Sequence, residues 1–154
     1  MAGKGKSIIL LMVWLVSGCQ TAVPTAGGET RLTLGLEYLA MGEYRAAERN
    51  LLRAQQALAG DYRPVLALAR LYQTEGHVSR AIVWYTQAEE MAPENGYVLN
   101  NYGAFLCALG QYDEARRRFT LAGQSREPGG LTEAQQLSAA CFTDERFLIS
   151  STAR

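Results

Sequence analysis

The sequence predicts an all-α fold made of repeated pairs of antiparallel helices, and two observations lead to this prediction. Residues of the same size class recur at an offset of 34 along most of the chain. A glycine also lies in the middle of each recurring block, where a first helix would end in a left-handed turn and the chain would reverse. A regular period of this length is typical of two-helix units that stack side by side.

Each block contains the side chains that two closely packed helices need. A small residue in the first helix and another in the second allow the helices to approach, and large apolar side chains interlock around that contact. The small residues are Gly35, Ala69 and Gly103 in the first helices, and Ala47, Ala81 and Ala115 in the second. The large residues are Leu34, Tyr38 and Leu51, then Leu68, Tyr72 and Tyr85, then Tyr102, Leu106 and Phe119; the turn glycines are Gly42, Gly76 and Gly110.

The start of the chain, residues 1–18, has the pattern of a secretion signal. Lys4 and Lys6, the only two lysines, precede a continuous apolar run, residues 8–16, which is too short to span a bilayer at about 20 residues. The segment from Val16 to Cys19 resembles the lipobox, at which bacterial lipoproteins are acylated on cysteine and cleaved before it. We therefore expect a lipid on Cys19 that anchors the chain to a membrane. The alternative is an ordinary cleaved signal with an incidental cysteine.

Residues 19–29 are predicted to be a flexible tether, because they contain Pro24, Gly27 and Gly28 and have no apolar period. Gln20, rather than Asp, follows Cys19, which in lipoproteins of enterobacterial type implies transfer to the outer membrane, facing the periplasm. Without residues 1–18 the chain has a net charge of −2, because both lysines are removed and every acidic residue remains.

The folded part divides into three repeats, residues 30–61, 62–95 and 96–129, and a partial fourth, residues 130–154. Leu137, Ala140, Cys141 and Phe142 are expected to give the last segment a buried face. We expect that segment to cap the third repeat, because each unit buries its apolar surface only against a neighbour.

The composition excludes several classes of function. The net charge of the whole chain is zero and 19% of its residues are charged, so we expect no nucleic-acid partner. Arg116, Arg117 and Arg118 are expected on a solvated helix face. The single histidine, His77, lies in a predicted turn, and no cysteine or histidine cluster has metal-ligand spacing. We therefore predict no enzymatic activity, cofactor, metal or small-molecule substrate, and an enzyme with an unrecognised site is the weakest alternative.

Over residues 28–129 the repeat pattern resembles that of the tetratricopeptide-repeat family. The resemblance implies a right-handed superhelix with the first helix of each pair on its concave side. Carried over position by position, the family's groove residues correspond here to Leu32, Leu36, Leu39, Arg63, Leu66, Arg70, Gln73, Tyr97, Asn100 and Ala104.

The four leucines of this set, Leu32, Leu36, Leu39 and Leu66, are expected to form an exposed apolar strip beside Arg63 and Arg70. Such a strip suits a peptide with apolar anchors and an acidic or carbonyl group. The alternative is that the tether or a second copy of the chain covers Leu32 and Leu36.

Cys107 and Cys141 are separated by one repeat length. Equivalent positions of neighbouring first helices face similar directions, so the Cα atoms are expected within the range of about 4.4–6.8 Å that a disulfide requires. An oxidising periplasm favours the bond. The alternative is two reduced, buried thiols.

The segment Asn100-Asn101-Tyr102-Gly103-Ala104-Phe105-Leu106-Cys107, with a second cysteine one repeat later, resembles the type IV pilus biogenesis lipoproteins of the PilW/PilF type, the pilotins. The resemblance implies a protein partner, the secretin subunit of the pilus, whose localisation and multimer assembly or stability the lipoprotein assists. The alternative is a lipoprotein adaptor that recruits or regulates peptidoglycan hydrolases or other envelope enzymes.

Overall fold

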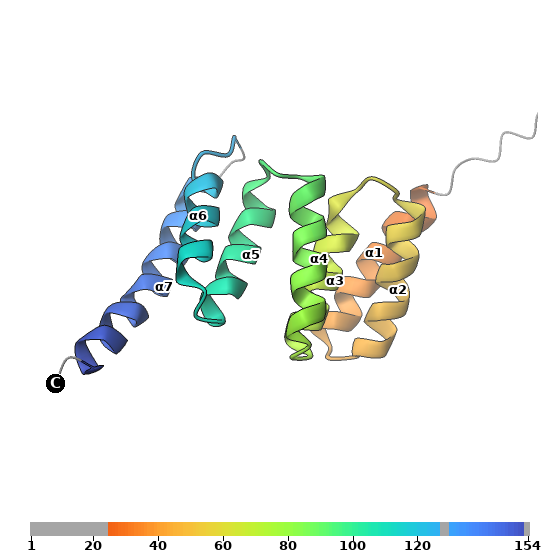
Figure 1. The fold of residues 1–154 in the computed structure, drawn as a ribbon. Coiled ribbons are helices and arrows are strands. Elements are labelled where there is room, and N and C mark those ends of the chain that lie inside the picture. Colours follow the sequence, from red (N-terminus) through yellow and green to blue (C-terminus); the bar gives the residue numbers. More distant parts are fainter. Residues whose placement is uncertain (1–24, 127–129, 153–154) are drawn as a thin grey trace, which may run out of the picture.

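A computed structural model describes residues 25–126 and 130–152, and within these ranges the chain forms helices and no strand (Figure 1). This result confirms the predicted all-α fold. The helices are α1 (Thr25–Ala40), α2 (Tyr44–Ala57), α3 (Tyr62–Thr74), α4 (Val78–Met91), α5 (Gly96–Ala108), α6 (Tyr112–Ala122) and α7 (Gly130–Thr152).

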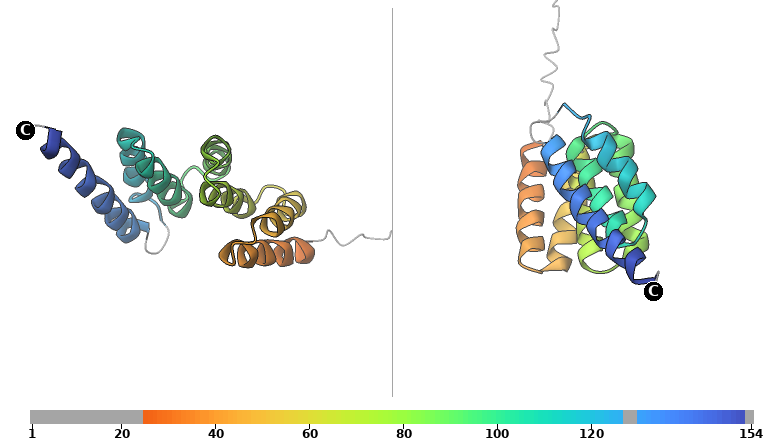
Figure 2. Two further views of the ribbon diagram at one scale, coloured as in Figure 1. Left: turned by 90° about the horizontal axis from the view of Figure 1, so that it is seen from below. Right: turned by 90° about the vertical axis from the view of Figure 1, so that its left-hand side faces the viewer.

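The helices form consecutive pairs, α1 with α2, α3 with α4 and α5 with α6, and α7 packs against both α5 and α6. Figures 1 and 2 show these pairs in chain order along an elongated molecule. Helices α3, α5 and α7 begin at Tyr62, Gly96 and Gly130, the first residues of the predicted second, third and partial fourth units.

Glycines make the turns within the pairs, as predicted. Gly42, Gly76 and Gly110 have φ of 75–76°, in the left-handed region that other residues rarely adopt. The amide after each glycine donates a hydrogen bond of 2.8–2.9 Å to a carbonyl near the end of the preceding helix: Glu43 to Tyr38, His77 to Tyr72 and Gln111 to Leu106.

The close contact inside a pair differs from the expected one. A Cβ atom on Gly35 would lie 2.6 Å from Cδ2 of Leu51, and one on Gly103 would lie 2.8 Å from Cε1 of Phe119. The glycine therefore accommodates a large side chain of the second helix, and its nearest neighbour is not the small residue that we expected there.

Helix α1 begins inside the predicted tether, which corrects that boundary: residues 25–29 are helical. Gly28 is buried, and a Cβ atom there would lie 2.7 Å from Cγ of Leu58, the residue that follows α2. Packing against Leu58 explains why the helix extends this far. Cys19, the signal and the rest of the tether lie outside the described residues.

Covalent, polar and cation–π contacts join α7 to the third pair. Cys107 and Cys141 form a disulfide with a Cα to Cα distance of 5.9 Å. Asn100 Nδ2 donates to Glu133 Oε2 at 3.3 Å, and the Arg116 guanidinium lies 4.2 Å from the centre of the Phe142 ring. Ala134 and Cys141 are buried, Leu137 and Phe142 are half-buried, and Ala140 is exposed, contrary to expectation, because it lies on the outer face of the helix.

The second and third pairs are joined by aromatic and ionic contacts. Tyr85 of α4 stacks on Tyr102 and Phe105 of α5, with ring centres 5.1 and 5.2 Å apart. Arg118 is not solvated as predicted: its side chain is 16% exposed, pairs with Glu89 at 3.0 Å and lies 4.3 Å from the centre of the Tyr102 ring. These side chains hold the second pair against the third.

Candidate protein-binding groove

The first helices α1, α3 and α5 surround a cavity of about 320 Å³, which we call the groove cavity. Six of the ten predicted groove residues line it: Leu32, Leu36, Arg63, Leu66, Arg70 and Tyr97. The remaining lining residues are Glu29, Thr33, Tyr62 and Ala67. Six of the ten positions carried over from the repeat pattern therefore lie together in space.

The apolar part of the cavity is a floor and not the exposed strip that we expected. Leu32 and Leu66 are only 5% and 3% exposed, because both side chains belong to the buried core. Leu39 is half-buried and packs against the core. Leu36 and Tyr97, at 39% and 46% exposed, are the apolar side chains that a partner can reach.

The other four predicted groove residues, Leu39 and the three that follow, do not line the cavity. Gln73 is exposed and accepts a hydrogen bond from the Tyr85 hydroxyl. Asn100 is completely buried and donates to Glu133 of α7, so the last helix covers it. Ala104 is half-buried against the core. The part of the groove beyond Tyr97 is thus used for internal packing.

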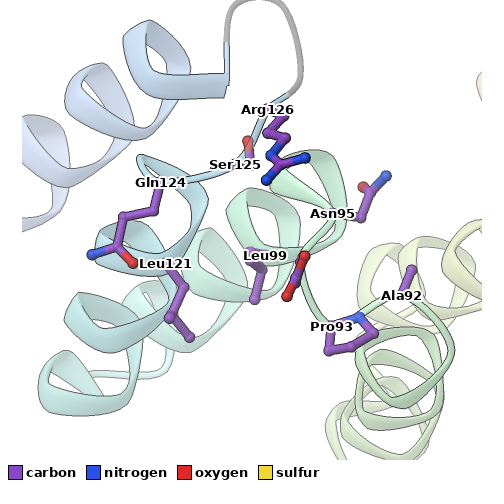
Figure 3. A pocket seen from close by; sticks show the side chains of 9 residues that line it. Ala92, Pro93, Asn95, Leu99, Leu121, Gln124, Ser125 and Arg126 are labelled. Carbon is purple, nitrogen blue, oxygen red and sulfur yellow. The ribbon is translucent and has the colours of Figure 1, made fainter.

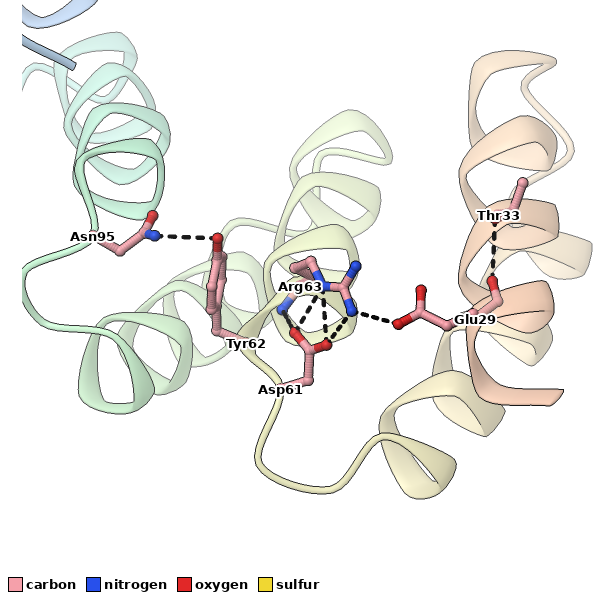
Figure 4. A network of polar contacts seen from close by, with 6 residues as sticks. All are labelled: Glu29, Thr33, Asp61, Tyr62, Arg63 and Asn95. Atoms are coloured by element: carbon pink, nitrogen blue, oxygen red, sulfur yellow. Dashed lines mark hydrogen bonds and ion pairs between the residues drawn. The ribbon is translucent and has the colours of Figure 1, made fainter. Parts of the chain in front are cut away.

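Arg63 is fixed by ion pairs at the start of α3 (Figure 4). Its Nη2 lies 2.6 Å from Glu29 Oε1, and its Nε lies 2.9 Å from Asp61 Oδ2. Asp61 also caps the helix by accepting from the Arg63 amide at 2.8 Å. These hydrogen bonds with Arg63 lower the pKa of Asp61 and raise the pKa of Arg63.

Arg70 differs from Arg63, because its guanidinium makes no hydrogen bond or ion pair with the residues that the structure describes. It is exposed and lies about two turns further along α3. Burial raises the pKa of the nearby Tyr85 hydroxyl, and the positive charge of Arg70 opposes that effect. Within the groove cavity, Arg70 is therefore the cation whose charge is not neutralised by a carboxylate of the described chain.

A second cavity, of about 650 Å³, lies between the loop that joins α4 to α5 and the end of α6 (Figure 3). None of the predicted groove residues lines it. Asn95 lies on the edge of this cavity, and its side chain makes hydrogen bonds within the fold. Its Oδ1 accepts from the Val98 amide at 2.9 Å and its Nδ2 donates to the Tyr62 hydroxyl at 3.1 Å. We therefore regard the groove cavity as the better candidate site.

Tyr62 is one of the lining residues that the predicted set did not include. It lies at the first position of α3, directly before Arg63, and only the three-dimensional path of the chain brings it beside Asn95, the residue before α5. In the described ranges, no three His, Cys, Asp or Glu side chains are grouped as metal ligands. Over the same ranges, no helix has the length and apolar character needed to cross a membrane.

Two overlapping segments match family models of the tetratricopeptide repeat, residues 62–95 and residues 84–117. Together with the helix pairs and the regular repeat period, these matches identify the type of repeat. The chain contains tetratricopeptide repeats.

This repeat protein is similar to two curated proteins over much of its length. It is 32% identical over 133 residues to the type IV pilus assembly protein PilF of Pseudomonas aeruginosa, an alignment covering 80% of this chain and 53% of PilF. It is 34% identical over 94 residues to an uncharacterised protein of Haemophilus influenzae, covering 61% of this chain and 52% of that protein. The chain thus spans about half the length of these relatives.

Solved structures of repeat proteins superpose well on this one. Pseudomonas aeruginosa PilF gives a TM-score of 0.73 at 27% identity, covering 79% of this chain and 55% of PilF. PilW, a widely conserved type IV pilus biogenesis factor, gives 0.70 at 23% identity and covers 77% and 54%. The type III secretion translocator chaperone SycD of Yersinia enterocolitica gives 0.67 at 19% identity and covers 78% and 95%. The last two likenesses concern the fold alone.

Proposed function

We propose that this protein is a lipid-anchored scaffold of type IV pilus biogenesis, which binds the secretin subunit and assists its localisation and multimer assembly at the outer membrane. The observation that carries the proposal is the similarity to PilF, which covers 80% of the chain. The groove cavity supports it, because three repeat helices converge there on apolar and cationic side chains.

The scaffold would be held at the membrane by acyl chains on Cys19. Each buried methylene of such a chain contributes about 0.8 kcal/mol, so more than one acyl chain gives stable anchoring without a membrane-spanning helix. The short segment between Cys19 and α1 would then separate the repeats from the membrane surface, with the groove open to the periplasm.

The chemistry of the groove supports binding rather than catalysis. His77 is exposed at the start of α4 and does not line the cavity. The Thr33 hydroxyl, which does line it, donates to the backbone carbonyl of Glu29 at 3.1 Å. A hydroxyl nucleophile needs a neighbouring base to activate it, and no base contacts Thr33 in the described part of the cavity.

The test is recovery of the acylated protein from membranes of the native host, together with deletion of its gene. We expect the secretin subunit to co-purify, and deletion to reduce secretin multimers and surface pili. Recovery of a peptidoglycan hydrolase without secretin would instead support the adaptor alternative. Unchanged secretin multimers and pili after deletion would show that the proposed function is wrong.

Two variants test the anchor. Cys19→Ala should release the protein from membranes, because the acylated thiol is lost. Gln20→Asp should leave acylation intact but shift the protein toward the inner membrane. The matched control is Thr21→Ala, which should fractionate with the outer membrane as the unaltered chain does. Outer-membrane fractionation of Cys19→Ala would contradict the lipid anchor.

A further inference from the structure

We propose that the groove cavity selects an acidic, apolar segment of the partner, in which a carboxylate binds Arg70 and a neighbouring apolar side chain packs between Leu36 and Tyr97. This inference rests on the proposed function in that it takes the occupant of the cavity to be a protein. It goes beyond that function by naming the chemistry of the segment and the residue that selects it.

The first step concerns which arginine is available. Arg63 already uses its Nε and Nη2 groups on Asp61 and Glu29, which hold the guanidinium at the start of α3. Arg70 has the same five N–H donors, and none of them is hydrogen-bonded to the described residues. A guanidinium of this kind can bind a carboxylate through two parallel hydrogen bonds, which a backbone carbonyl cannot match.

The second step concerns the apolar contacts. Leu32 and Leu66 form a buried floor, and Leu36 and Tyr97 are partly exposed above it. The cavity volume, about 320 Å³, is at the lower end of the range of about 300–1,000 Å³ for ligand pockets, so it suits one or two side chains of a longer segment. Tyrosine and arginine are also the residue types that most often dominate binding energy at protein interfaces.

The third step concerns charge. The lining contains two arginines and one acidic residue, Glu29, whose carboxylate is paired with Arg63. The charge of Arg70 therefore remains, and it favours an acidic segment over a basic one, since like charges in an interface oppose binding. A neutral segment with the same apolar residues would remove water from the Arg70 guanidinium without supplying a carboxylate in its place, which weakens binding.

The experiment measures peptide binding to the full chain, purified from membranes in detergent. The probes are two matched libraries of short fluorescent peptides, with one acidic residue placed at every spacing from Leu and Phe; in the second library Asp and Glu are replaced by Asn and Gln. We expect the best acidic peptides to bind at least about tenfold more tightly than their amide counterparts, as a charge-assisted hydrogen bond allows.

Arg70→Gln should abolish this preference, so that an acidic peptide and its amide counterpart bind equally. Arg53→Gln is the matched control, because Arg53 is an exposed residue of α2 outside the cavity, and it should keep the preference. Both variants should unfold at the temperature of the unaltered protein, since both side chains are exposed.

Three results would overturn the inference: no binding of acidic peptides, equal binding of the two libraries, or a preference that persists in Arg70→Gln. Co-purification of secretin separates this inference from the proposed function. If secretin is recovered equally well with Arg70→Glu, the inference fails and the function stands. If the peptide preference depends on Arg70 but secretin is not recovered with the unaltered chain, the function fails and the inference stands.

Discussion

At the scale of single residues, Asp61 has two roles at the start of α3. Its carboxylate caps the helix through the Arg63 amide and also pairs with the Arg63 guanidinium. Ionisation strengthens both interactions, and the hydrogen bond to the side chain of Arg63 is the larger cause of the lowered pKa of Asp61. The same residue therefore stabilises the helix and fixes the orientation of one arginine of the groove cavity.

Asp61→Ala should reduce the free energy of unfolding by about 1 kcal/mol at pH 7, because the cap is lost. Asp61→Asn keeps a capping oxygen and should be destabilised less. Because the pKa of Asp61 is lower in the folded state, its contribution is complete above the unfolded pKa, near 3.8, and disappears as the pH falls through the lower folded value. Urea unfolding at pH 7 and in strong acid measures both effects. Equal stability of Asp61→Ala and the unaltered chain at pH 7 would contradict this account.

Gly103 shows how closely the helices of a pair approach. An Ala there would place Cβ 2.8 Å from Cε1 and 3.0 Å from Cδ1 of Phe119, so the ring would have to move. Overpacking of this kind costs about 1–3 kcal/mol, against a gain in helix propensity of about 1 kcal/mol. We predict a net loss of up to about 2 kcal/mol in urea unfolding. When Gly103→Ala and Phe119→Leu are combined, the loss of stability should be smaller than the sum of the two single losses. A loss equal to that sum would mean that the added Cβ atom does not strain the Phe119 ring.

At the scale of elements, we expect the disulfide to contribute more than noncovalent packing to the attachment of α7. Only Ala134 and Cys141 of its described side chains are buried, and Leu131 is 53% exposed. A bond that closes a loop of 34 residues contributes about 3–4 kcal/mol by restricting the unfolded chain. The attachment of this last helix to the array is therefore expected to respond to the redox state of its surroundings.

Replacing both Cys107 and Cys141 by Ser should increase the rate of amide hydrogen exchange in α7 much more than in α1 to α4. The double variant is the proper comparison, because a single replacement leaves a free thiol for intermolecular bonds. The mass of the unaltered chain, measured after alkylation with and without prior reduction, should differ by two alkyl groups, one on each thiol that reduction releases. Equal protection of α7 in the two proteins would mean that its noncovalent contacts suffice.

At the scale of the whole molecule, the features that depend on repetition could be predicted from the sequence. The helix pairs and the turns at Gly42, Gly76 and Gly110 follow from a pattern that occurs three times. Burial at single positions was harder to predict. Arg116, Arg117 and Arg118 point in directions about 100° apart around α6, so which one meets Tyr102 depends on how the third pair is placed against the second. For the same reason the pattern identified Leu32 and Leu66 as groove residues but not their enclosure.

The stability of a repeat array is approximately the sum of the stabilities of its units and of the contacts between neighbours. Loss of one contact between neighbours should therefore allow the repeats on either side of it to unfold separately. Tyr85 is the centre of the contact between the second and third pairs, being 1% exposed and stacked on Tyr102 and Phe105. Tyr85→Ala should therefore cost about 3–5 kcal/mol and separate unfolding into two steps, with α1 to α3 losing exchange protection at a different urea concentration from α5 to α7. Tyr85→Phe keeps the stack, removes only the hydrogen bond to Gln73, and should unfold in a single step. If Tyr85→Ala also unfolds in one step for both halves, the coupling between repeats resides in Arg118 and Glu89 instead.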